Sequence, residues 1–101
     1  MTRTITFTHI QRYLIQNKPV LSSNFCVKQI GIFGSFIHET QTPSSDIDLL
    51  VEFKKGKETF RNYMNLKFYL EDEFGRKVDL IIKETLKAAI RDQVLEEVVY
   101  A

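Results

Sequence analysis

Short apolar runs separated by polar segments predict a small β-sheet. Residues 30–33 are apolar and rich in β-branched side chains, and they stop at Gly34 and Ser35, which is typical of a buried strand that ends in a turn. Residues 46–51 begin with two acids and become apolar, and residues 77–82 alternate in polarity. We therefore predict three strands, with acidic side chains on the second and the third.

Longer segments have the periodicity of amphipathic helices. Lys18-Pro19 ends the first of them, and residues 20–26 contain too many Ser and Asn side chains to predict more than a short turn of helix. The predicted helices run from a Thr8 cap to about Asn17, from about Glu58 to Phe74 with Gly75 as the C-cap, and from about Thr85 to Tyr100.

The helix predicted over residues 58–74 carries two apolar stripes. A helix that covers a sheet needs only one, so the second stripe has two interpretations: it completes the core around the sheet edge, or it is a surface for another protein. The first stripe comprises Tyr63, Leu66, Leu70 and Phe74, and the second comprises Phe60, Met64 and Phe68.

The second strand brings two acids to one side of the sheet. The period of two places Asp46 and Asp48 together, opposite Ile47. Two neighbouring carboxylates repel each other and lose hydration, and a divalent cation removes that cost. Mg²⁺ typically binds one or two carboxylates together with substrate phosphates. Gly34 and Ser35 provide the phosphate side, because backbone N–H groups at the start of a short following helix and a hydroxyl can hold an anion.

Asp79 is a third acid, placed in the middle of the third strand. An aspartate is disfavoured there unless it is paired or functional. One interpretation is an ion pair with Lys77 or Arg76. The other is a third carboxylate beside Asp46 and Asp48, and three carboxylates around two Mg²⁺ ions suit nucleotidyl transfer. The combination with the other motif residues favours catalysis.

Length and composition limit the substrate. A chain of 101 residues can build one core, so we predict a single domain, 1–101, that modifies a molecule supplied from outside. The hydrophobic content of 44% and charged content of 27% are ordinary for a soluble globular protein. The formal net charge of +1 argues against a basic nucleic-acid surface.

Cys26 is the only cysteine, which excludes an internal disulfide and fits a reducing compartment. A lone cysteine with apolar neighbours is more often a small core residue than a nucleophile. The sequence shows neither a signal peptide nor a run long enough to span a membrane. We therefore expect a cytoplasmic protein.

The motif of Gly34 and Ser35 followed, after ten residues, by Asp46 and Asp48 resembles the minimal nucleotidyltransferases, or MNT proteins, of the DNA polymerase β-like superfamily. The resemblance implies an α/β (α+β) domain with a small mixed sheet flanked by helices, and we expect these helices on one face only. Further similarity lies in Ser45, the Leu-Leu-Val-Glu-Phe run at 49–53, Lys-Val-Asp-Leu-Ile at 77–81 and the terminal Glu-Glu-Val-Val-Tyr at 96–100.

The resemblance also implies roles for these residues. Asp46 and Asp48 would bind two Mg²⁺ ions, and Asp79 would join one ion and help to deprotonate the acceptor hydroxyl. Gly34 and Ser35 would bind the nucleotide. MNT proteins often accompany HEPN-domain ribonuclease toxins and neutralise them by adenylylating a tyrosine. The resemblance thus implies an antitoxin that transfers AMP from ATP to a HEPN toxin, as part of a homo- or hetero-oligomer.

Two alternatives remain open from the sequence. Family members commonly have Ala-Arg-Gly where this chain has Ile37, His38 and Glu39. That difference favours a binding-only antitoxin, with a degenerate active site, that blocks its partner by occlusion. We interpret His38 as a solvated turn residue in preference to a phosphate ligand. A small-molecule nucleotidyltransferase that modifies an antibiotic is the second alternative, against which the absence of a second domain argues.

Overall fold

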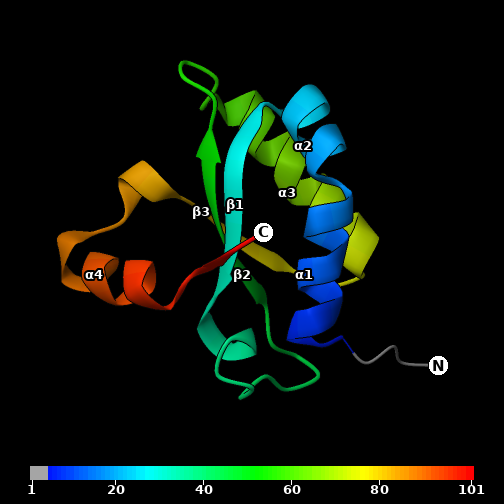
Figure 1. Cartoon of the computed structure of the whole chain (residues 1–101), viewed down its shortest axis with the longest axis vertical. Coiled ribbons are helices and arrows are strands. Elements are labelled where there is room, and N and C mark those ends of the chain that lie inside the picture. Colours follow the sequence, from blue (N-terminus) through cyan, green and yellow to red (C-terminus); the bar gives the residue numbers. More distant parts are fainter. Residues whose placement is uncertain (1–4) are drawn as a thin grey trace.

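A four-stranded mixed sheet forms the centre of residues 5–101, the part of the chain that the computed structural model describes (Figure 1). The strand order is β3-β2-β1-β4, in which β1 is antiparallel to both β2 and β4, and β2 is parallel to β3. The strands are β1 (Val27–Phe33), β2 (Ile47–Phe53), β3 (Val78–Ile82) and β4 (Val99–Tyr100). The predicted mixed sheet is confirmed, with a fourth strand that the sequence pattern did not indicate.

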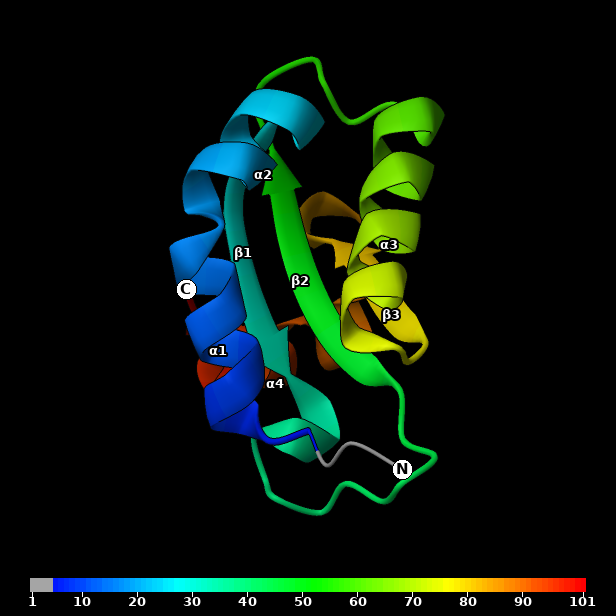
Figure 2. The same ribbon diagram turned by 90° about the vertical axis from the view of Figure 1, so that its right-hand side faces the viewer.

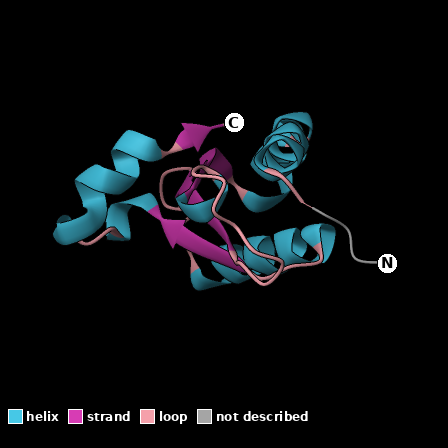
Figure 3. Ribbon diagram, turned by 90° about the horizontal axis from the view of Figure 1, so that it is seen from below, coloured by secondary structure: helices cyan, strands magenta, loops and turns pink. Residues whose placement is uncertain are grey.

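Helices cover both faces of this sheet, so the prediction of helices on one face is wrong (Figure 3). The two faces have separate apolar clusters, which Leu49 and Leu50, adjacent on β2, enter from opposite sides. The helices α1, α2 and α3 pack on one face, and α4 packs on the other. They are α1 (Phe7–Gln16), α2 (Lys18–Phe25), α3 (Phe60–Phe74) and α4 (Ala88–Glu97), with short 3₁₀ turns η1 (Gly34–Phe36) and η2 (Lys83–Thr85).

The N-terminal helices differ from the prediction in their boundaries. The hydroxyl of Thr6, and not that of Thr8, caps α1, because it accepts a hydrogen bond from the backbone N–H of His9 at 3.2 Å. Pro19 lies in the first turn of α2, where the missing N–H of proline costs nothing. Residues 18–25 therefore form a true helix, which ends at Cys26 in a left-handed conformation.

In α3 the first stripe packs into the core, whereas two residues of the second stripe remain outside it. Leu66, Leu70 and Phe74 are buried against the sheet, and Gly75 ends the helix in a left-handed conformation as predicted. Figure 2 shows α3 and α1 lying side by side over the same face. Phe60 and Phe68 from the second stripe are 81% and 58% exposed. The core interpretation of that stripe is therefore wrong for these two residues.

The predicted terminal helix over residues 85–100 is shorter than expected. It spans Ala88–Glu97, and β4 follows it on the edge of β1. Two β-branched residues and a tyrosine at 98–100 explain the change, since such side chains favour a strand where a partner edge is free. Gly31 permits this pairing, because a Cβ there would lie 2.7 Å from Cγ2 of Val98.

No helix in the described part of the chain has the length and apolar character required to cross a membrane.

Candidate functional site

The motif residues meet where β1 ends and β2 begins. Gly34 follows β1 with a φ of +77°, a left-handed conformation that favours glycine, and it starts the 3₁₀ turn η1. A side chain at this position would collide with the carboxylate of Asp48. The backbone of the Gly34-Ser35 turn therefore lies directly against the acidic strand.

The acidic strands are neighbours, as required for their carboxylates to come together. Asp48 on β2 is the register partner of Asp79 on β3. Asp46 lies immediately before β2 and is exposed, as is Asp79, whereas Asp48 is half-buried. Ile47 is fully buried toward the opposite face, as the period of two predicted. The structure thus brings all three predicted acids to one end of the β2–β3 pair.

The pKa of Asp48 reflects the repulsion among these acids. Burial, followed by the negative charges of Asp79 and Asp46, raises the pKa of Asp48 from 3.8 to about 6, and a hydrogen bond from the backbone N–H of Ser35 opposes the rise. At neutral pH the site therefore holds concentrated negative charge, which a cation would relieve.

The three carboxylates fit Mg²⁺ in their chemistry. Within residues 5–101, no three His, Cys, Asp or Glu side chains converge closely enough to form a ready-made metal cage. Mg²⁺ does not require one, because it prefers oxygen ligands and commonly shares them among a few carboxylates, water and substrate phosphates. The donor set therefore suits a cation that binds together with a phosphate-bearing substrate.

The ion-pair interpretation of Asp79 is not what the structure shows. None of the ion pairs in the described range includes Asp79, and Lys77 is exposed. Arg76 uses its guanidinium elsewhere.

Arg76 fastens the loop that leads into the acidic strand. Its Nη1 donates hydrogen bonds to the backbone carbonyls of Thr42 and Ser45, at 3.2 Å each. The guanidinium also lies 5.5 Å from the ring centre of the fully buried Phe36. Arg76 thereby connects the 3₁₀ turn with the residue that precedes Asp46. The sequence could not predict this role, because every residue has a backbone carbonyl and no residue type identifies the acceptors.

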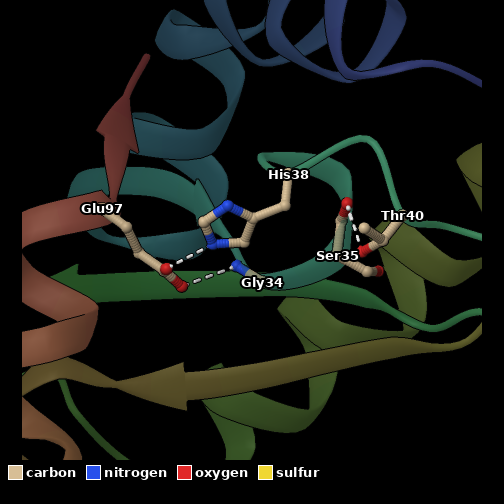
Figure 4. Close-up of polar contacts among 5 residues, drawn as sticks. All are labelled: Gly34, Ser35, His38, Thr40 and Glu97. Atoms are coloured by element: carbon tan, nitrogen blue, oxygen red, sulfur yellow. Dashed lines mark hydrogen bonds and ion pairs between the residues drawn. The ribbon is translucent and has the colours of Figure 1, made fainter.

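Glu97, the last residue of α4, contacts the Gly34-Ser35 turn (Figure 4). Its Oε1 accepts a hydrogen bond from the backbone N–H of Gly34 at 3.1 Å. Its Oε2 lies 2.7 Å from Nε2 of His38. His38 is exposed, as predicted for a turn residue, but it has a fixed partner that the sequence did not reveal. The sequence offered only the terminal Glu-Glu-Val-Val-Tyr run as a point of resemblance, which assigns no contact to Glu97.

Glu39 adopts the conformation that a glycine would take more easily. Its φ is +56°, in the left-handed region, and its side chain is exposed. The turn closes next to it, where the backbone N–H of Thr40 donates to the carbonyl of Ser35 at 3.0 Å. Glu39 stands where the resembled family commonly has glycine, and this backbone geometry gives a physical reason for that preference.

Comparisons with known proteins agree with this geometry. A family model described as a nucleotidyltransferase domain matches residues 14–101. The protein adenylyltransferase MntA of Thermococcus cleftensis is 38% identical over 96 residues, which cover 95% of this chain and 96% of that protein.

Two solved structures have a similar fold. A candidate minimal nucleotidyltransferase gives a TM-score of 0.78 at 28% identity, over 94% of this chain and 95% of the other. A chain from the complex of a tri-AMPylated Shewanella oneidensis HEPN toxin with an MNT antitoxin gives 0.62 at 18% identity, over 89% and 70%. At that identity the second likeness concerns the fold alone.

Proposed function

Because this chain belongs to the nucleotidyltransferase domain family, as a minimal enzyme of the protein adenylyltransferase kind, we propose that it transfers AMP from ATP to a partner HEPN toxin. It would act as the antitoxin of that toxin. The resemblance to MNT antitoxins points to a tyrosine hydroxyl as the acceptor. The choice of partner follows from the same resemblance.

The observation that carries this proposal is the pairing of an acidic cluster with a glycine turn. Asp48 lies in register with Asp79 and directly against the backbone of Gly34. A phosphate held by the turn would therefore lie beside carboxylates that need a cation. This juxtaposition suits a nucleoside triphosphate bound with Mg²⁺.

The residues have separate tasks in the proposed reaction. The N–H groups of the turn and the Ser35 hydroxyl would bind the phosphates of ATP. Asp46, Asp48 and Asp79 would hold Mg²⁺, expected as two ions. When bound, the cation neutralises charge that develops on the phosphate oxygens.

The transfer itself requires an acceptor oxygen and a proton acceptor. The toxin hydroxyl attacks the α-phosphorus of ATP, a new oxygen–phosphorus bond forms, and the bond to the bridging oxygen breaks to release pyrophosphate. The exposed carboxylate of Asp79 takes the hydroxyl proton. Because Asp46 and Asp79 are both exposed, a side chain on another protein can reach them.

The binding-only antitoxin remains the second candidate function, and one observation favours it. The N–H of Gly34 already donates to Glu97, and that of Ser35 interacts with Asp48. Both of these backbone donors are thus used by carboxylates of the chain itself, as expected for an active site that no longer binds nucleotide.

The Asp48→Asn variant separates the two functions. We expect wild type to suppress the ribonuclease activity of its toxin only when ATP and Mg²⁺ are supplied, and the variant to bind the toxin without suppressing it. The fold should persist, because asparagine preserves the shape of the half-buried side chain. Suppression by Asp48→Asn equal to that by wild type would establish occlusion as the mechanism.

A further inference from the structure

The carboxylate of Glu97 accepts a hydrogen bond from Gly34, whose N–H is one of the phosphate donors in the proposed function. Its Oε1 accepts this hydrogen bond at 3.1 Å, and its Oε2 lies 2.7 Å from Nε2 of His38, so both carboxylate oxygens have a polar partner. Its side chain is only 17% exposed. Figure 4 shows Glu97 reaching across from α4 to the turn.

The backbone on each side of Glu97 is fixed, so this contact is built into the fold. The N–H of Val98 donates to the carbonyl of Val94 at 2.9 Å, which closes α4. Beyond it, β4 pairs with β1, and the N–H of Ala101 donates to the carbonyl of Ile30 at 3.0 Å. The carboxylate is therefore held over the turn by ordered backbone before and after it.

Carboxylates and phosphates compete for the same donors. A backbone N–H in a glycine turn can donate to either anion, and the hydrogen bond is strong because the acceptor is charged. A triphosphate that approached Gly34 would also meet the negative charge of Glu97 a few ångströms away. Nucleotide binding at this turn therefore requires Glu97 to move.

We propose that Glu97 is an internal anion that occupies the phosphate-binding N–H of Gly34 in the nucleotide-free chain and is displaced by ATP. This inference rests on the proposed function, because it takes the Gly34-Ser35 turn as the phosphate site. His38 is 57% exposed, and its imidazole gives the displaced carboxylate a partner other than the N–H of Gly34. Nucleotide binding is then coupled to the C-terminal segment that positions Glu97.

Adjacent glutamates provide a matched test. Glu97→Gln and Glu96→Gln each remove one negative charge from the same helix, but the side chain of Glu96 is exposed and makes no hydrogen bond in the described residues. We expect Glu97→Gln to bind a non-hydrolysable ATP analogue with Mg²⁺ about fivefold more tightly than wild type, as expected for one unit charge at ~4 Å in water. Glu96→Gln should bind within twofold of wild type, by isothermal titration calorimetry.

The amide resonances give an independent readout. In wild type, the analogue should shift the ¹⁵N–¹H signals of Gly34 and of residues 98–100, because Glu97 leaves the turn. In Glu97→Ala, the Gly34 signal should already be shifted without nucleotide, and residues 98–100 should no longer respond to it. A thermal unfolding curve verifies that each variant is folded.

The outcomes distinguish the inference about Glu97 from the proposed function. If wild type binds the nucleotide and Glu97→Gln binds it equally or more weakly, the role of Glu97 is wrong and the phosphate site is still supported. Binding by Glu97→Gln or Glu97→Ala, but not by wild type, would support the inference strongly. If none of the folded proteins binds the analogue with Mg²⁺, both the inference and the proposed nucleotide site are wrong.

Discussion

Asp48 carries the largest electrostatic cost in the site. Its carboxylate is half-buried, faces Asp79 across the parallel pair and has a pKa raised to about 6. Enzymes commonly concentrate perturbed groups of this kind where they bind cations or move protons. The same cost makes the site measurable through stability, without any assay of activity.

We predict that Asp48→Asn stabilises the protein at pH 7.5. Because the pKa of Asp48 is raised in the folded state, the native chain keeps a proton between pH 4 and 6 that the unfolded chain releases. The free energy of unfolding therefore falls as pH rises through this window. The substitution should recover about 1 kcal/mol at pH 7.5, a value reduced for solvent screening, and nothing near pH 4.

Urea unfolding at both pH values measures this difference, with Asp92→Asn, at an exposed position on α4, as the control. Mg²⁺ should raise the thermal midpoint of wild type and have little effect on Asp48→Asn, because the cation relieves the same repulsion. A variant that is less stable than wild type at pH 7.5 would contradict this account of the acidic cluster.

At the scale of elements, α3 separates the residues that hold the fold from those that remain outside it. Leu70 is completely buried against the sheet, whereas Phe68, two positions earlier, is 58% exposed. Hydrophobic character alone does not distinguish the two, because both belong to an apolar stripe of the same helix. Their predicted energetic effects differ widely.

Leu70→Ala should lower the free energy of unfolding by about 2–5 kcal/mol, since it removes buried methyl groups and leaves a cavity. Phe68→Ala should change it by no more than about 0.5 kcal/mol. Chemical denaturation of the two variants in parallel measures both values. A cost at Phe68 similar to that at Leu70 would mean that the second stripe packs against something after all.

Local patterns in the sequence predicted the elements that local forces determine. Period-two alternation located Asp48 and Asp79 on their strands, and Gly75 marked the end of α3, because each signal lies within a few neighbouring residues. The sequence did not show that their two strands are neighbours. The structure shows that they are, with Asp48 and Asp79 as register partners.

Interactions between distant segments could not be predicted in the same way. Glu97 and Gly34 are separated by 63 residues, and no periodicity connects them. The apolar spacing of the final residues predicts a helix, yet Val99 and Tyr100 pair with the free edge of β1 as a strand. The prediction of helices on one face failed for the same reason, because the apolar stripe of a helix does not reveal which face of the sheet it covers.

At the scale of the whole molecule, the candidate site lies at one end of the sheet, between β2 and the segment that carries Glu97. Exposed acids at that end suit an acceptor located on another protein. Oligomeric state and the identity of the partner stay predictions from the family resemblance.

Intact mass spectrometry of the proposed partner, a HEPN toxin that forms a complex with this chain, tests the central claim most directly. The toxin would be incubated with wild type or Asp48→Asn, with and without ATP and Mg²⁺. We predict a gain of one or more AMP units only with wild type and both co-reactants, with fragmentation placing them on a tyrosine. A tight complex with a toxin of unchanged mass would contradict adenylylation and make this chain a binding antitoxin.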